Sequence, residues 1–271
     1  MTPRGSRSRL DAELVRRGLV TSREQAAAAI AAGRVLVSGR PAAKPATAVA
    51  PGEPVVVRGD DPGWASRGAH KLLGALEAFA QGEPPLAVAG RRCLDAGAST
   101  GGFTDVLLRQ GATAVLAVDV GYGQLLWRLR NDERVTVLDR TNVRYLTPAD
   151  VGEPVELVVG DLSFIPLHFV LPALRAVSSA DADLVLLVKP QFEVGRQRLG
   201  AGGVVRDPAS RAAAVRGVAD AAAALGLGVA GVVASPLPGP AGNVEYLLWL
   251  RSGAAPLDDD ALRVAITKGP S

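Results

Sequence analysis

The chain has 271 residues, of which 48% are apolar, and it carries a net charge of +3, one cysteine and two histidines. This length fits one large domain or two modest ones, and the apolar content is ample for a core. One cysteine excludes an internal disulfide framework, and two histidines argue against a zinc site, so we expect no metal. No long uncharged apolar run or signal-peptide pattern is present, so we expect a cytoplasmic protein without a membrane segment.

The positive charge is concentrated at the start of the chain. Residues 1–64 hold 10 Lys and Arg against 6 Asp and Glu, whereas the remaining residues hold 20 against 21. A basic segment attached to a nearly neutral body suggests a polyanionic partner for that segment, although charge alone could equally reflect a solvated surface.

Residues 1–59 are expected to form a small α+β domain. Leu10 and Leu14 share a face of a helix over residues 7–19, and Thr21 or Ser22 caps a second helix that ends near residue 32. Strands follow at 34–37 and 54–58. Residues 60–65 are a linker, in which Trp64 either pins the two domains together or packs as an isolated ring.

Residues 66–271 are expected to form a second domain of the α/β class. A helix over 66–80, whose apolar face Lys71 adjoins, precedes alternating strands and helices, which is the pattern of a parallel sheet. The loop 191–206 is rich in glycine and arginine. The predicted strands are 92–95, 114–118, 135–138, 157–159, 184–188, 229–234 and 244–250, and the predicted helices are 103–110, 124–130, 207–225 and 258–266.

A glycine turn separates the first of these strands from its helix. The stretch from Cys93 to Phe103 reads CLDAGASTGGF, in which Cys93 is expected to be a core residue. Ser99 occupies the place of the second glycine of a dinucleotide fingerprint, which weakens that interpretation. An acid before the turn instead suits a cationic cofactor such as S-adenosylmethionine. The candidate residues of the turn are Asp95, Gly97, Ala98, Ser99, Gly101 and Gly102.

Polar residues stand at the ends of five successive predicted strands. They are Asp95, Asp119, Asp139, Asp161 and Lys189. Ligands of open α/β sheets bind at the carboxyl ends of the strands, so these side chains outline an active site. Asp119 lies near the offset at which an acid meets ribose hydroxyls, and we expect Asp139 or its neighbours to approach the adenine edge.

The N-terminal part resembles the RNA-binding module named after ribosomal protein S-four. The resemblance rests on Arg9-Leu10-Asp11 and on the segment 33–39, which reads GRVLVSG. Such modules bind RNA mainly through its shape and phosphates. An ordinary helical cap domain is the alternative. The basic residues expected to contact RNA here are Arg7, Arg9, Arg16, Arg17, Arg23, Arg34, Arg40 and Lys44.

Five further motifs resemble the TlyA family of bacterial ribosomal-RNA 2′-O-methyltransferases, whose members often carry haemolysin names. The motifs are GASTGG, SRGAHKL, GDLSF, LVKPQFE and SPLPGPAGNVEYLLW, and the resemblance covers essentially the whole chain. It implies a Rossmann-like class I fold of the FtsJ/RrmJ type that uses S-adenosylmethionine. It also implies a catalytic tetrad, carried here by Lys71, Asp161, Lys189 and Glu245.

The chemistry of the reaction agrees with that assignment. A ribose 2′-hydroxyl is a poor nucleophile and needs a base, and a lysine serves as one only when neutral, a form that burial and a second ammonium favour. We expect Lys189 to be the base, Asp161 and Glu245 to orient it, and Lys71 to position the ribose. Asp161 is also expected near the sulfonium of the cofactor.

The resemblance further implies a cytidine of 23S rRNA in the 50S subunit as the substrate, and in longer members a 16S cytidine of the 30S subunit. The terminal extensions fit the longer type, but Pro62-Gly63-Trp64-Ala65 keeps only the tryptophan of its Arg-Ala-Trp-Val linker. The modification is linked to capreomycin and viomycin sensitivity, and we expect a monomer. Tyr122 and Phe164 are candidates for stacking on a flipped cytidine, with core packing as the alternative. Arg67, Arg140 and Arg196 are candidates for phosphate contacts.

Three other functions compete with this interpretation. A membrane-active haemolysin would need a spanning or strongly amphipathic helix, which the sequence lacks. A nicotinamide dehydrogenase is disfavoured by the spacing of the glycine turn. A catalytically silent RNA-binding assembly factor is disfavoured by the complete tetrad, and an assay is needed to exclude it.

Overall fold

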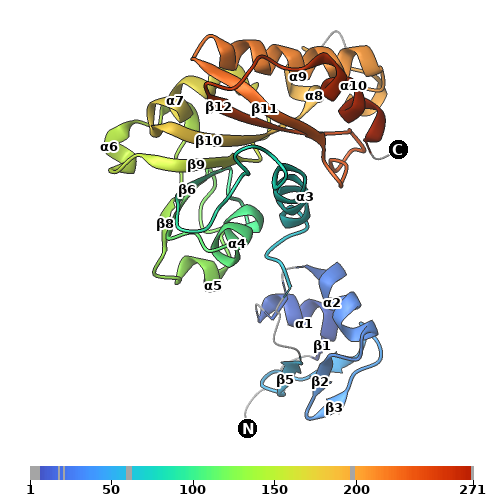
Figure 1. Cartoon of the computed structure of the whole chain (residues 1–271). Helices are drawn as coiled ribbons and strands as arrows, with labels where there is room; N and C mark the ends of the chain where they lie inside the picture. Colours follow the sequence, from blue (N-terminus) through green and yellow to red (C-terminus); the bar gives the residue numbers. More distant parts are fainter. Residues whose placement is uncertain (1–6, 18, 21, 59–62, 196–198, 270–271) are drawn as a thin grey trace. The chain divides into compact units, whose positions relative to one another are not determined.

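The computed structural model of the chain describes residues 7–17, 19–20, 22–58, 63–195 and 199–269. It contains two compact units, Met1–Ser66 and Arg67–Ser271 (Figure 1). Each unit has a hydrophobic core of its own.

The N-terminal unit packs two helices against short strands. Helix α1 (Leu10–Arg16) and helix α2 (Arg23–Ala31) bury Leu10, Leu14 and Ile30 in the core, and the Ser22 side chain caps α2 by accepting a hydrogen bond from the Gln25 N–H. The strands are β3 (Arg40–Pro41), β2 (Val35–Val37) and β5 (Val55–Val57) in one sheet, and β1 (Ser8–Arg9) with β4 (Ala48–Val49) in a second pair. The expected order of two helices and then two strands is found in α1, α2, β2 and β5, but Ser8–Arg9, predicted within the first helix, form strand β1, and two short strands lie between β2 and β5.

The C-terminal unit is built on a seven-stranded sheet with the order β11-β12-β10-β9-β6-β7-β8. Five neighbouring strands are parallel, and β12 runs antiparallel between β10 and β11. The predicted α/β fold is therefore confirmed. The strands are β6 (Arg92–Ala96), β7 (Ala114–Val118), β8 (Val135–Leu138), β9 (Val155–Gly160), β10 (Ser178–Val188), β11 (Leu227–Ala234) and β12 (Tyr246–Ser252).

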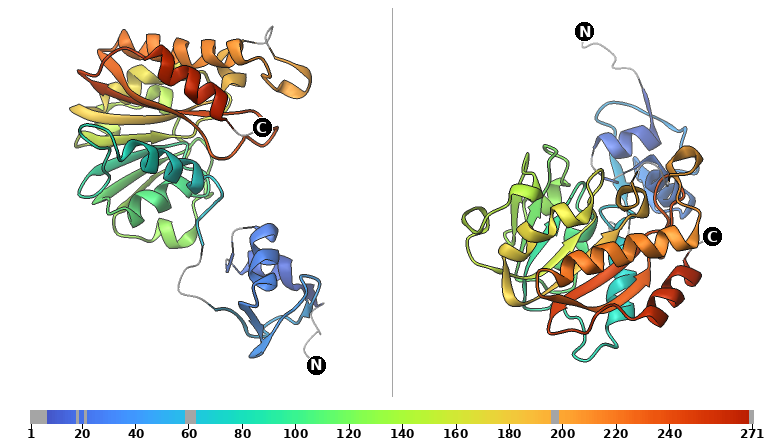
Figure 2. Two further views of the ribbon diagram at one scale, coloured as in Figure 1. Left: turned by 45° about the vertical axis from the view of Figure 1, so that its right-hand side comes forward. Right: turned by 90° about the horizontal axis from the view of Figure 1, so that it is seen from above.

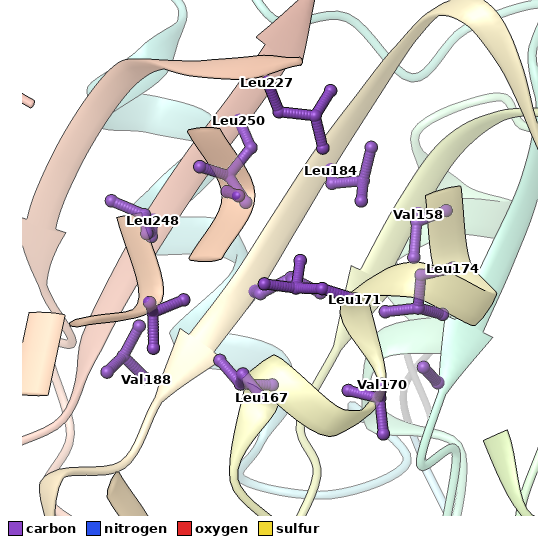
Figure 3. Packing of buried hydrophobic residues seen from close by; sticks show 14 of the residues in the cluster. Val158, Leu167, Val170, Leu171, Leu174, Leu184, Val188, Leu227, Leu248 and Leu250 are labelled. Carbon is purple, nitrogen blue, oxygen red and sulfur yellow. The ribbon is translucent and has the colours of Figure 1, made fainter. Parts of the chain in front are cut away.

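Helices cover both faces of this sheet (Figure 2). On one face, Leu171 of α7 (Leu171–Ala176) and Leu262 of α10 (Asp259–Lys268) share a core with Leu248 and Leu250 of β12; several members of that core appear in Figure 3. On the other face, Trp249 of β12 contacts Phe79, at the end of α3 (Ala69–Phe79). The other helices are α4 (Gly102–Arg109), α5 (Trp127–Arg130), α6 (Pro148–Val151), α8 (Pro190–Glu193) and α9 (Pro208–Ala223).

Several boundaries differ from those expected. Helix α8 overlaps the start of the predicted loop 191–206, because Pro190 can begin a helix that is only one turn long. Strand β10 begins at Ser178 instead of residue 184. A register shift separates its polar first half from the apolar part, so the sequence pattern does not mark the first half as strand. Helices α6 and α7 were not predicted, since four to six residues are too few to display a helical period.

Candidate functional site

The glycine turn after β6 brings the backbone close to neighbouring segments. Gly97 has φ +86°, and a Cβ atom there would lie 3.0 Å from the Asp161 carbonyl oxygen. Gly101 has φ +100°, and its Cβ atom would collide with the Leu129 side chain. Glycine is therefore required at both positions for steric reasons.

A cavity of about 700 Å³ opens beside this turn at the carboxyl edge of the sheet. Asp119 faces it, and each of its carboxylate oxygens accepts one backbone hydrogen bond, from Ser99 at 2.8 Å and from Gly121 at 2.7 Å. Asp119 thus joins the turn to the end of β7. The cavity is lined by Gly97, Ser99, Val118, Asp119, Val120, Gln124, Asn142, Val143, Arg144, Asp161, Leu162, Ser163, Phe164, Ile165, Phe169 and Val170.

Two other acids expected at the cofactor are placed outside this lining. Asp95 is fully buried and accepts the Thr104 hydroxyl of α4 at 2.7 Å, and burial raises its pKa to about 7. Asp139 pairs with Arg130 at 2.9 Å, and that hydrogen bond lowers its pKa. Ala98, Gly101 and Gly102 belong to the turn without lining the cavity.

Strand register brings four charged side chains together. Gly160 of β9 pairs with both Ala96 and Leu186, so Asp161 follows β9 in the middle of the sheet edge. Val188 pairs with Tyr246 in the antiparallel β10–β12 ladder, so Lys189 and Glu245 emerge beside each other. Lys71 reaches the same place from the first turn of α3.

These four side chains form a chain of ion pairs. Lys189 Nζ lies 2.5 Å from Asp161 Oδ1, and Lys71 Nζ lies 3.6 Å from Asp161 Oδ2 and 2.6 Å from Glu245 Oε2. Lys71, Lys189 and Glu245 are buried, whereas Asp161 faces the cavity. Two ammoniums balance two carboxylates, so a lysine that loses its proton remains held by a carboxylate. The arrangement suits proton transfer beside the cavity, which Asp161 lines and the other three residues do not.

Known proteins that are similar to this chain include methyltransferases, which agrees with the chemistry that the site suggests. The family model of the FtsJ-like methyltransferases matches the sequence over residues 64–252, and the family model of the S4 domain matches it over residues 8–55. The chain is 61% identical over 270 residues to the Mycobacterium tuberculosis protein named 16S/23S rRNA (cytidine-2′-O)-methyltransferase TlyA, which covers 97% of this chain and 99% of that one.

The chain belongs to the TlyA branch of the FtsJ-like methyltransferases. It is also 45% identical to YqxC of Bacillus subtilis, provisionally named an rRNA methyltransferase, over 90% of this chain and 85% of that one. A solved structure from Streptococcus thermophilus, provisionally named a hemolysin, has a TM-score of 0.72 at 36% identity and covers 97% of this chain and 95% of its own.

Aromatic residues of this TlyA-type unit gather near the cavity. Phe164 lines it, is 90% exposed, has φ +65°, and its ring centroid lies 5.2 Å from that of Phe192. Tyr122 is also exposed, and the Arg140 guanidinium lies 4.4 Å from its ring centre. An exposed ring held in the left-handed region is unusual for a residue with no function.

The structure adds cavity residues that the sequence did not single out. Arg144 stacks over Phe169, with its guanidinium 4.8 Å from the ring centre, and both line the cavity. Asn142 lines it as well, and its side chain accepts a hydrogen bond from the Arg144 N–H. Ser163 accepts a hydrogen bond from Lys189 at 2.8 Å. The only available signal was that these residues follow predicted strands.

The basic residues of the N-terminal unit fall into two groups. Arg17 is largely enclosed: it donates to Glu13 at 2.7 Å and to the Glu53 carbonyl at 2.6 Å, which points to a structural role. Arg34 is half-buried. The second group is exposed and contains Arg7, Arg9, Arg16, Arg23, Arg40 and Lys44. Of the candidates in the C-terminal unit, Arg67 is exposed and Arg196 lies outside the described residues.

Two structural features bear on the alternative functions. Within the described part of the chain, none of the helices combines the length and apolar character needed to cross a bilayer. Among the same residues, no three His, Cys, Asp or Glu side chains are grouped so that they could hold a metal ion.

Proposed function

We propose that this protein transfers the methyl group of S-adenosylmethionine to the ribose 2′-oxygen of a cytidine in ribosomal RNA. The observation that supports the proposal is the Lys71–Asp161–Lys189–Glu245 cluster, which meets the cavity at Asp161. The name of the M. tuberculosis relative supports cytidine as the target in 23S and 16S rRNA.

The cavity fits S-adenosylmethionine in size and chemistry. Gly97 lines the cavity and lets the turn pack closely against the Asp161 backbone. Asp119 can still accept ribose hydroxyls, because each of its carboxylate oxygens has a second lone pair. When bound, the cofactor supplies an electrophilic methyl group. A carboxylate at Asp161 favours its cationic sulfonium. We also assign Asp95, Ala98, Ser99, Gly101, Gly102 and Asp139 to the cofactor side, as residues that shape the turn and its flanks.

Lys189 is the proposed base. In its neutral form the amine takes the proton of the target 2′-hydroxyl while the oxygen attacks, and becomes an ammonium held by Asp161 at 2.5 Å. Lys71, fixed by Glu245 at 2.6 Å, contributes a positive charge that helps to position the ribose oxygens. Alignment of the 2′-oxygen accounts for much of the remaining acceleration.

RNA recognition is assigned to both units. Phe164 and Tyr122 are exposed rings on which an extruded cytidine can stack. Phosphate contacts come from basic residues of both units, whose charge attracts the RNA backbone in a salt-dependent way. Arg17 is better explained as a structural residue. The proposed phosphate contacts are Arg7, Arg9, Arg16, Arg23, Arg34, Arg40, Lys44, Arg67, Arg140 and Arg196.

We further propose that residues 1–59 act as the RNA-binding domain, 60–65 as the linker and 66–271 as the catalytic domain. The enzyme would work as a cytoplasmic monomer on 50S and 30S subunits, and its loss would reduce sensitivity to capreomycin and viomycin.

The test is transfer of a labelled methyl group from S-adenosylmethionine to purified 50S and 30S subunits that lack the modification. We expect labelled 2′-O-methylcytidine from both, and none with the Lys189→Ala variant although it still binds the cofactor. Labelling of 50S alone would restrict the substrate to 23S rRNA. Binding of RNA without any transfer would favour the assembly-factor alternative.

A further inference from the structure

Ser163 holds the amine that the mechanism uses as a base. It is the second residue after Asp161, it lines the cavity, and its Oγ lies 2.8 Å from Lys189 Nζ. The segment that follows it is constrained: Phe164 adopts a left-handed φ of +65°, and the Leu167 N–H donates to the half-buried Glu193 carboxyl at 2.9 Å.

The geometry has a direct consequence for a neutral lysine. A neutral amine has two N–H donors and one lone pair. Asp161 Oδ1 at 2.5 Å and Ser163 Oγ at 2.8 Å accept one donor each. With both hydrogens engaged, the lone pair takes the remaining tetrahedral direction and the amine cannot rotate about its Cε–Nζ bond.

We propose that Ser163 is a positioning residue that aims the Lys189 lone pair at the target 2′-hydroxyl. The proposal rests on the function given above. In the step it serves, the bond between the methyl carbon and sulfur breaks, the bond between that carbon and the 2′-oxygen forms, and the 2′-hydroxyl proton moves to Lys189. Ser163 accepts a hydrogen bond from the amine before and after the transfer, and exchanges no proton.

The charged groups around Lys189 set its protonation together. Asp161 contacts it directly, and Lys71 and Glu245 act through Asp161 from α3 and from the residue before β12. Ser163 is the uncharged member of this set. Its removal takes away one acceptor that stabilises the ammonium form, so it should shift the pH at which Lys189 becomes active without changing the net charge of the site.

The experiment compares wild type, Ser163→Ala and Ser163→Thr in single-turnover methyl transfer to saturating 50S subunits from pH 6 to pH 10. Ser252→Ala is the matched control, since Ser252 is exposed at the far end of β12 and its hydroxyl donates to the Ala180 carbonyl, away from the cavity. We expect Ser163→Ala to be about 10- to 100-fold slower, with unchanged affinity for cofactor and RNA. The acidic limb of its pH–rate profile should move to lower pH. Ser163→Thr should restore both the wild-type rate and the wild-type position of that limb.

A second measurement does not depend on turnover. The side-chain amine of Lys189, observed by ¹⁵N NMR and assigned with the Lys189→Ala variant, should titrate at lower pH in Ser163→Ala than in wild type. Absence of methyl transfer by the wild type would refute the proposed function, whereas an unshifted Lys189 titration would refute the role of Ser163. An active wild type with an equally fast Ser163→Ala, or with a slow variant that threonine does not rescue, would also overturn it.

Discussion

Replacing Lys71 by methionine should separate the stability of the buried cluster from its chemistry. The Lys71 side chain is 7% exposed and its Nζ lies 2.6 Å from Oε2 of Glu245, which is fully buried. Removing one partner of such a pair leaves an uncompensated charge, which typically costs about 3–5 kcal/mol. Since about 1 kcal/mol shifts the midpoint of a domain of this size by roughly 2–4 °C, unfolding of the C-terminal unit should occur about 6–20 °C lower.

The double variant Lys71→Met/Glu245→Gln supplies the decisive comparison. It removes both charges and leaves the Asp161–Lys189 pair, so its midpoint should return close to that of the wild type. Arg263→Met is the control, because the Arg263–Asp260 pair is exposed and should contribute little. The melting temperatures are measured by calorimetry. Methyl transfer should be lost in both the single and the double variant, because both lack Lys71. Purely additive destabilisation in the double variant would refute the argument that the pair compensates a buried charge.

Three further predictions concern other parts of the molecule. Gly101→Ala should abolish cofactor binding in a calorimetric titration and lower stability, since its Cβ would meet Leu129; normal binding would contradict the turn geometry. Arg17→Ala should destabilise the N-terminal unit by about 1.5–3 kcal/mol. Lys44→Ala should leave folding intact and reduce the slope of log affinity for RNA against log salt concentration by about 1. The opposite result would mean that Lys44 is the structural residue and Arg17 the phosphate contact. Burial raises the pKa of Asp95 from 3.8 to about 7, so wild-type stability should fall as pH rises through that window, and Asp95→Asn should flatten the dependence of the melting temperature on pH.

The sequence could predict those parts of the site in which the order of the strands alone determines which residues lie together. Parallel strands end at one edge, so residues that follow them, such as Asp161 and Lys189, are brought together by topology. Glu245 follows a long proline- and glycine-rich segment, and its place beside Lys189 became clear from the resemblance and then from the register of β10 with β12.

Side-chain direction could not be predicted in the same way. Asp95 stands at a strand end, yet it points to Thr104 of α4 and away from the cavity. Arg17 looks like its basic neighbours in sequence, but its contact with the Glu53 carbonyl bridges 36 positions of chain. Ser163 lies in the GDLSF motif, but the sequence does not indicate its role, because a serine in a loop becomes informative only when Lys189 is seen beside it.

The most direct test of the account is mass spectrometry of nucleosides from 50S subunits incubated with S-adenosylmethionine and either wild type or Lys189→Ala. The proposed mechanism predicts 2′-O-methylcytidine with the wild type and none with the variant, whose folding and cofactor binding should be normal. Methylation on the base of the nucleoside, or 2′-O-methylcytidine at the wild-type rate with Lys189→Ala, would contradict it.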